Sequence, residues 1–376
     1  MREMFKPAML VLEDGTCFRG RSFGSEGECG GEVVFNTSMM GYTEVLTDPS
    51  YMGQMVCMTY PLIGDYGITE EDFESRSVFL SGFIVKENSR IASNWRSSCT
   101  LDEFLKKQKI IGIEGIDTRR LVKHIRNDGA MKGVISTIDL DAESLAGKAA
   151  ALPGLVGRNL VDEVTADKMY VWSEPKYDAI PCKTEFKIVV IDYGVKYNIL
   201  RGLVSHGCDV TVVPASTTAQ EILAMNPDGI FLSNGPGDPS ALTEILGEIK
   251  KLIGKKPIFG ICLGHQLLSL AFGAQTYKLK FGHHGGNQPV IRLGTRQVEI
   301  TCQNHGFVVD QDSLSGMPLE ITHINLNDNT VEGFAHKELP IFSVQYHPES
   351  APGPHDSNYL FEQFAQMMRT NAPVLA

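Results

Sequence analysis

Gly260-Ile-Cys-Leu-Gly-His-Gln266 is the stretch that decides the fold, and it directly follows the short apolar run Pro257–Phe259. Glycines two residues before and two residues after Cys262 permit a sharp turn from a strand into a helix. Cys262 would then lie at a helix N-terminus, where backbone N–H groups and the helix dipole favour the thiolate, the form that attacks carbonyl carbon. Because Cys262 is one of eight cysteines, and most free cysteines are merely buried small hydrophobes, the glycines and a distant His/Glu pair are what favour a nucleophile.

The distant pair is His347-Pro-Glu349, near the other end of the chain. An imidazole with a pKa near neutrality is suited to take the proton of a cysteine and return it to a leaving group. Residues i and i+2 of an extended segment project to the same side, so Glu349 can hold His347. An exposed histidine and glutamate in a loop is the alternative for the tripeptide alone, but Cys262 makes a catalytic triad the favoured interpretation.

From Phe186 onward, short apolar runs alternate with helical patterns, as in strands that are buried on both faces. The runs are Ile188–Ile191, Val210–Val213, Gly229–Leu232 and Pro257–Phe259, and a helix is expected over Ala241–Ile253. We therefore predict an α/β fold with a mostly parallel central sheet wrapped by helices. Ligands of such sheets bind beyond the carboxyl ends of the strands. Three segments that follow strands should thus converge on one site: Cys262, the loop Ser233–Pro239, and His347.

The residues before this region have a different pattern, which predicts a separate domain. Up to about residue 140 the sequence is β-rich, with a hairpin turn after Ala8–Leu12 and one plausible helix at Thr118–Arg126. Segments that are rich in alanine, proline or charge follow, and they indicate a connector. We expect a β-rich α/β N-terminal domain over residues 1–150, a connector over 151–185, and the domain with the parallel sheet over 186–376.

Composition narrows the class of protein. The 376 residues are enough for two domains with separate cores. A net charge of −11 argues against nucleic acid or an anionic membrane as partner, because neutralising phosphate needs a basic patch. The cysteines are scattered without a Cys-x-x-Cys pair, and the apolar run at Ala8–Leu12 is too short for a signal segment or a membrane span. A reduced, cytoplasmic protein is expected.

Two further features suggest binding roles. Acyl transfer needs N–H donors for an oxyanion, and the amide of Leu263 and the loop with Gly235 and Gly237 are candidates, with a plain turn as the alternative for that loop. The loop lacks the G-x-G-x-x-G spacing of a dinucleotide site. His283-His284 could be metal ligands, but adjacent residues of a strand point to opposite faces, so we expect no metal in this chain.

Three of these segments together resemble the class I glutamine amidotransferases: Gly260–Gln266, Asn234-Gly-Pro-Gly-Asp238 and His347-Pro-Glu349. Other segments narrow the resemblance to the small, glutamine-hydrolysing subunit of carbamoyl phosphate synthetases. They are Asp192–Arg201, Lys280–Asn287, Asn304–Phe307 and Tyr346–Asp356 in the second domain, and Asn36–Glu44, Leu46–Tyr51, Thr59–Gly64 and Gly115–Arg119 in the first. The resemblance covers almost the whole chain.

The resemblance implies roles for the matching residues. Cys262 would form a γ-glutamyl thioester, His347 would act as acid and base, and Glu349 would hold His347. The amides of Leu263 and Gly235 would form the oxyanion hole. The residues implied to hold glutamine or its oxyanion are Ser38, Gly235, Gly237, Leu263, Gln266, Asn304, Gly306 and Phe307. Met40 and Asp65 stand where the family usually has threonine and asparagine, which bears on the lining of the glutamine pocket.

The resemblance also implies a partner. Ammonia would pass to a separate large subunit of a heterodimer, where bicarbonate and ATP yield carbamoyl phosphate for arginine and pyrimidine biosynthesis. ATP and magnesium are expected on that large subunit and no cofactor in this chain, which has no G-x-x-x-x-G-K-[ST] phosphate loop.

Two alternatives to this function are weighed. One is another triad amidotransferase, such as the anthranilate- or guanylate-forming type, or a free-standing cysteine hydrolase. The first domain disfavours it, because Asn36–Glu44 and Gly115–Arg119 have no role there. The other is a non-catalytic regulatory homologue. It predicts a broken triad, whereas Cys262, His347 and Glu349 are all present.

Overall fold

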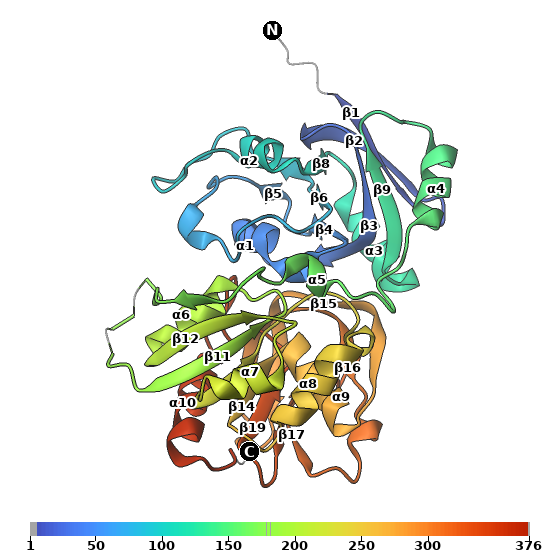
Figure 1. The fold of residues 1–376 in the computed structure, drawn as a ribbon. Helices are drawn as coiled ribbons and strands as arrows, with labels where there is room; N and C mark the ends of the chain where they lie inside the picture. Colours follow the sequence, from blue (N-terminus) through green and yellow to red (C-terminus); the bar gives the residue numbers. More distant parts are fainter. Residues whose placement is uncertain (1–5, 178, 181, 375–376) are drawn as a thin grey trace. The chain divides into compact units, whose positions relative to one another are not determined.

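Two compact units make up the computed structural model, which describes residues 6–177, 179–180 and 182–374. The first unit comprises the residues up to Leu155 together with Lys280–His284, and the second comprises Val156–Leu279 and the residues from Gly285 onward. Figure 1 shows the elements of each unit along the chain. Most of the expected connector over residues 151–185 thus counts with the second unit.

A closed β-barrel forms the first unit. Its strands in barrel order are β1 (Pro7–Leu12), β2 (Cys17–Gly24), β8 (Ile111–Glu114), β6 (Gly82–Ile84), β4 (Gln54–Met58), β3 (Glu28–Asn36) and β9 (Met131–Ser136). The antiparallel pairing of β1 with β2 confirms the predicted hairpin, and β3, β4, β6 and β8 pair in parallel. A short parallel pair, β5 (Leu62–Ile63) with β7 (Glu87–Asn88), forms a separate sheet.

The helices of the first unit are α1 (Tyr42–Thr47), α2 (Leu101–Gln108), α3 (Thr118–Asp128) and α4 (Ala142–Ala151). Helix α3 confirms the helix predicted at Thr118–Arg126. Asp117 caps its N-terminus by accepting a hydrogen bond from the Arg120 amide (2.9 Å). Its buried face carries Leu121 and Ile125, which pack in the same apolar cluster as barrel residues, as the spacing of four residues requires.

A ten-stranded sheet organises the second unit. Its order is β10 (Tyr170–Trp172), β12 (Cys208–Pro214), β11 (Phe186–Asp192), β13 (Gly229–Leu232), β14 (Ile258–Ile261), β19 (Ile341–Val344), β18 (Val331–His336), β17 (Leu319–Asn325), β15 (Thr276–Arg292) and β16 (Val298–Val309). The neighbours from β12 to β19 pair in parallel and contain the runs predicted as strands. The predicted α/β fold is confirmed. On the other side of β19 the strands β18, β17 and β15 pair antiparallel, a flank that the sequence analysis missed.

Helices cover the parallel strands on both faces. They are α5 (Val161–Val164), α6 (Tyr197–Ser205), α7 (Ala219–Ala224), α8 (Thr243–Leu252), α9 (Leu263–Phe272) and α10 (Tyr359–Thr370). Alternate strand residues serve the two faces: Ile230 and Leu232 pack in one apolar cluster with residues of α7, α8 and α9. Phe231, between them, packs in a second cluster with residues of α6 and α10. Among the described residues, no helix is both long enough and apolar enough to cross a membrane.

Candidate active site

Cys262 occupies a strained elbow between β14 and α9. Its φ angle of 53° and ψ angle of −103° are unusual for a residue with a side chain, and it caps the N-terminus of α9. The flanking glycines serve close packing rather than the turn, because Cys262 itself takes the positive φ. A Cβ on Gly264 would lie 2.3 Å from the Leu232 carbonyl oxygen, and one on Gly260 would lie 2.9 Å from the backbone of Gly264. The strained backbone is thus held at Cys262 itself.

His347 and Glu349 form a buried pair just after β19. The Nδ1 of His347 lies 2.7 Å from Glu349 Oε1, and the two side chains are 1% and 0% exposed. The backbone of His347 is fixed by its amide, which donates to the Cys302 carbonyl (2.8 Å). Glu349 also accepts a hydrogen bond from the Nζ of the buried Lys196 (2.9 Å), and that ammonium donates to the Ala351 carbonyl as well.

These charges set the protonation states of the pair. Burial alone would raise the pKa of Glu349, but the positive charges of Lys196 and His347 outweigh it and hold that pKa well below the usual carboxyl range. Burial alone would lower the pKa of His347, but the charges of Glu349 and Cys262 outweigh it and raise the pKa to about 10. The raised pKa favours the imidazolium form of His347 at neutral pH.

The sulfur of Cys262 has two hydrogen-bonding neighbours besides His347. The Nε2 of Gln345 donates to Sγ across 3.6 Å, and Sγ lies 3.7 Å from the Asn304 carbonyl oxygen. The amide of Cys262 donates to the Val344 carbonyl (2.9 Å), which ties the elbow to β19. Cys262 and His347 thus lie at the ends of the adjacent parallel strands β14 and β19, where the strand-end rule places them.

The loop with Gly235 and Gly237, which follows β13, packs closely against other segments of the second unit. A Cβ on Gly235 would lie 2.2 Å from the Tyr193 carbonyl oxygen, and Gly237 has a φ of 90°. Asp238 accepts from the amides of Gly157 (2.8 Å) and Ser240 (2.9 Å). Leu263 is the first residue of α9, so its amide is not used within the helix. The loop and the helix start are rigid supports for backbone donors.

The residues expected to hold glutamine fall into two groups. Gln266 on α9 donates its Nε2 to the Phe307 carbonyl (2.7 Å), and Asn304, Gly306 and Phe307 follow one another on β16. The space beside Gly306 is open, because no atom other than those of its two chain neighbours lies within 4 Å of an added Cβ. Ser38 belongs to the first unit, where its amide donates to Asn36 Oδ1 (2.7 Å).

The sequence analysis missed two buried polar residues of this site, Lys196 and Gln345. Lys196 is 2% exposed, and a lysine buried to that extent requires a carboxylate partner. The signal was its place in the Val195-Lys196-Tyr197 run directly after a buried strand. Gln345 immediately precedes Tyr346 and His347 and is fully buried. No spacing in the sequence pairs either residue with Glu349 or Cys262.

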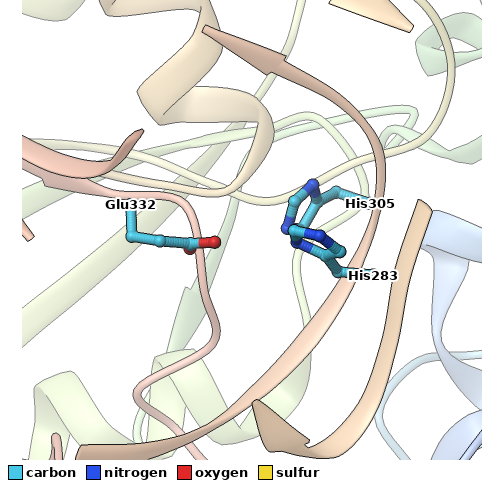
Figure 2. A group of neighbouring side chains, drawn as sticks. All are labelled: His283, His305 and Glu332. Atoms are coloured by element: carbon cyan, nitrogen blue, oxygen red, sulfur yellow. The ribbon is translucent and has the colours of Figure 1, made fainter. Parts of the chain in front are cut away.

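The histidines weighed as metal ligands, His283 and His284, are both buried. Figure 2 shows His283 together with His305 of β16 and Glu332 of β18, and His283 belongs to the first unit. Within the second unit, ligand-type atoms of His305 and Glu332 lie within 4.8 Å of one another. His305 contacts the Phe307 carbonyl (3.0 Å), and Glu332 accepts from Asn325 Nδ2 (3.1 Å). The absence of a metal stays a prediction.

We predict that two buried histidines, His265 and His323, make the protein lose stability in acid. Burial lowers the pKa of His265 to about 3 and that of His323 to about 3. The unfolded chain, with histidine pKa values near 6.5, then binds more protons than the folded chain between about pH 6.5 and 3. Each histidine should therefore remove about 1.4 kcal/mol of unfolding free energy per pH unit in that window.

Urea unfolding at pH values above and within this window measures the effect. We expect His323→Gln to reduce the fall in stability on acidification. His265→Gln should reduce the fall likewise. An unaltered pH dependence in His323→Gln would contradict the assignment.

Comparison with known proteins identifies the family. The model "Carbamoyl-phosphate synthase small chain, CPSase domain" matches residues 10–135, and "Glutamine amidotransferase class-I" matches residues 189–367. A relative named "Carbamoyl phosphate synthase small chain" from Syntrophotalea carbinolica is 60% identical over 370 residues, 97% of this chain and 98% of the relative.

Proteins of the same name from two other organisms are covered over nearly their whole length. The relative from Chlorobaculum tepidum is 58% identical over 365 residues, 96% of this chain and 98% of its own. That from Aquifex aeolicus is 56% identical over 369 residues, 97% of this chain and 99% of its own. The resemblance found in the sequence motifs is confirmed. This chain belongs to the carbamoyl phosphate synthase small chain family, and its second unit carries a class I glutamine amidotransferase domain.

Proposed function

We propose that this chain hydrolyses the side-chain amide of glutamine and supplies the ammonia to a large subunit that makes carbamoyl phosphate. The observation that carries the proposal is the buried charge array of the second unit. The elbow presents Cys262 beside an imidazolium, His347, whose other nitrogen is held by Glu349 at 2.7 Å. A nucleophile, an acid that is already protonated and an orienting carboxylate are the groups that amide hydrolysis through a thioester needs.

The reaction begins with the Cys262 thiolate. Its sulfur attacks the carboxamide carbon of glutamine and forms a C–S bond, and the carbonyl oxygen becomes an oxyanion. His347 gives its Nε2 proton to the departing nitrogen, the C–N bond breaks, and ammonia leaves with a γ-glutamyl thioester on Cys262. The same imidazole then takes a proton from water. The hydroxide adds to the thioester carbon, and glutamate departs as the thiolate is restored.

Backbone donors would stabilise the oxyanion in both steps. The amides of Leu263 and Gly235 are proposed for this role, and each such donor is worth about 3 kcal/mol of barrier in comparable enzymes. The rigid packing of Gly235 against Tyr193 and the helix start at Leu263 support it. The residues proposed to hold the glutamine are Ser38, Gly237, Gln266, Asn304, Gly306 and Phe307.

The partner is proposed from the family. The printed name of the relatives, a small chain, implies a large subunit. We place bicarbonate, ATP and magnesium on that subunit, and no cofactor on this chain. The heterodimer would serve arginine and pyrimidine biosynthesis. The complete triad supports catalysis over a purely regulatory role.

The test uses the full chain, purified alone and together with a co-expressed large subunit. Glutamate release from glutamine and carbamoyl phosphate formation are measured in both preparations. We expect weak glutamate release by the chain alone, faster release in the complex, and carbamoyl phosphate in the complex only. Carbamoyl phosphate synthesis by the isolated chain, or a complex that works only with added ammonia, would refute the proposal.

A further inference from the structure

A second polar side chain, besides His347, reaches the sulfur of the nucleophile. Gln345 follows β19 directly and is fully buried. Its amide donates to the Glu332 carbonyl (2.9 Å), which fixes the backbone. Its side-chain Nε2 lies 3.6 Å from Cys262 Sγ, a normal length for an N–H donor to sulfur. The triad mechanism described above does not use this contact.

The neighbours of Gln345 determine which end of its amide faces the sulfur. The Phe307 carbonyl can only accept, so the Gln266 group that lies 2.7 Å from it must be the NH₂ group. The same nitrogen of Gln266 lies 3.0 Å from the Gln345 side chain. Gln345 must therefore turn its oxygen toward Gln266, and its NH₂ group is left facing Cys262. A series of hydrogen bonds that ends on the Phe307 carbonyl thus fixes which group of Gln345 faces the sulfur.

The two hydrogen-bonding neighbours of the sulfur favour opposite protonation states. The Asn304 carbonyl, 3.7 Å from Sγ, can only accept and therefore favours an S–H group. The Gln345 N–H group can only donate to sulfur, and its bond is strongest when the sulfur carries the negative charge. The charged groups around Cys262 and Gln345 are His347 and, on the far side of His347, Glu349 and Lys196. The nearby His265 is directed to the Ser343 hydroxyl (2.9 Å) instead.

We propose that Gln345 is a positioning residue for the nucleophile, which holds the Cys262 sulfur in place and stabilises its thiolate through an N–H···S hydrogen bond. The proposal deepens the glutamine hydrolysis proposed above and rests on it for its catalytic consequence. The bond is strong in the thiolate and weak in the thioester, where sulfur has lost its charge. Gln345 should therefore favour the thiolate both before attack and as the leaving group of the second step.

The test follows alkylation of Cys262 by iodoacetamide against pH, resolved by peptide mass spectrometry so that the other cysteines do not interfere. Gln345→Leu removes the donor and keeps most of the volume. We expect the pH midpoint of Cys262 alkylation to rise by about one unit, and kcat for glutamate release to fall about tenfold with little change in KM. Ser343→Ala removes a buried hydroxyl two residues away that bonds His265, and it should leave the midpoint unchanged.

The isosteric Gln345→Glu keeps an acceptor toward Gln266 but places a carboxyl oxygen at the sulfur, and it carries the test if Gln345→Leu does not fold. The pH midpoint of Cys262 alkylation should rise at least as far in Gln345→Glu as in Gln345→Leu. A folded Gln345 variant with the wild-type midpoint would overturn the proposal, as would an equal shift in Ser343→Ala. Alkylation is measured without glutamine. A wild-type chain that releases no glutamate therefore refutes the proposed function, while the midpoint shift still decides the role of Gln345.

Discussion

Replacing Cys262 by serine should lower glutamate release from glutamine by about 10⁴-fold or more, as removal of the nucleophile does in comparable triads. A serine hydroxyl does not give up its proton to the His347 imidazolium that the buried carboxylate maintains. The elbow geometry should survive, because the two side chains differ by one atom and the strain lies in the backbone. The measurement is glutamate release by the complex with the large subunit, with ammonia as the alternative nitrogen source.

Cys208→Ser is the matched control. Cys208 is also buried in the second unit, and burial raises the pKa of its thiol well above the usual range, so it is chemically inert. We expect Cys208→Ser to retain glutamate release and Cys262→Ser to retain only synthesis from ammonia. Glutamate release at the wild-type rate in Cys262→Ser would contradict the thioester mechanism.

The parallel half of the second unit could be predicted because its strands are short, apolar throughout and bounded by turns. Both faces of Ile188–Ile191 and Gly229–Leu232 are covered by helices. Their sequences are therefore apolar throughout and do not alternate between apolar and polar residues. The helix predicted over Ala241–Ile253 starts two residues later, at Thr243, because Asp238 accepts from the amide of Ser240 and starts a separate short turn. Sheet order then places Cys262 and His347 at adjacent strand ends, although β15 to β18 separate β14 from β19 in the chain.

The antiparallel flank was harder to foresee. β15 and β16 are long strands with half-buried and polar residues on both sides, such as Lys278 and Gln303, so period-2 alternation is weak. Residues 280–284 of β15 count with the first unit. No local sequence pattern indicates that part of a strand belongs to the other unit. The distances that define the site are equally non-local: Lys196 and Glu349 are separated by 153 residues, and only the folded sheet brings their charges together.

Lys196→Met should destabilise the second unit by about 3 kcal/mol and also slow glutamine hydrolysis strongly. Lys196 is 2% exposed, and its Nζ lies 2.9 Å from Glu349 Oε1. Removing one member of a buried ion pair leaves an uncompensated charge, which typically costs about 3–5 kcal/mol. The imidazolium of His347 still faces Glu349 at 2.7 Å, so the lower end of that range is expected. Urea unfolding measures the stability, and glutamate release measures the activity.

The double variant Lys196→Met/Glu349→Gln separates charge balance from catalysis. Neutralising Glu349 removes the uncompensated charge, so the double variant should recover most of the lost stability. It should not recover activity, because the Glu349 charge that raises the pKa of His347 against its burial is gone, and a neutral imidazole has no proton to give to the departing nitrogen at its Nε2. A single variant as stable as wild type would show that Lys196 contributes nothing to the array. Recovered activity in the double variant would show that the charge of Glu349 is dispensable for the chemistry.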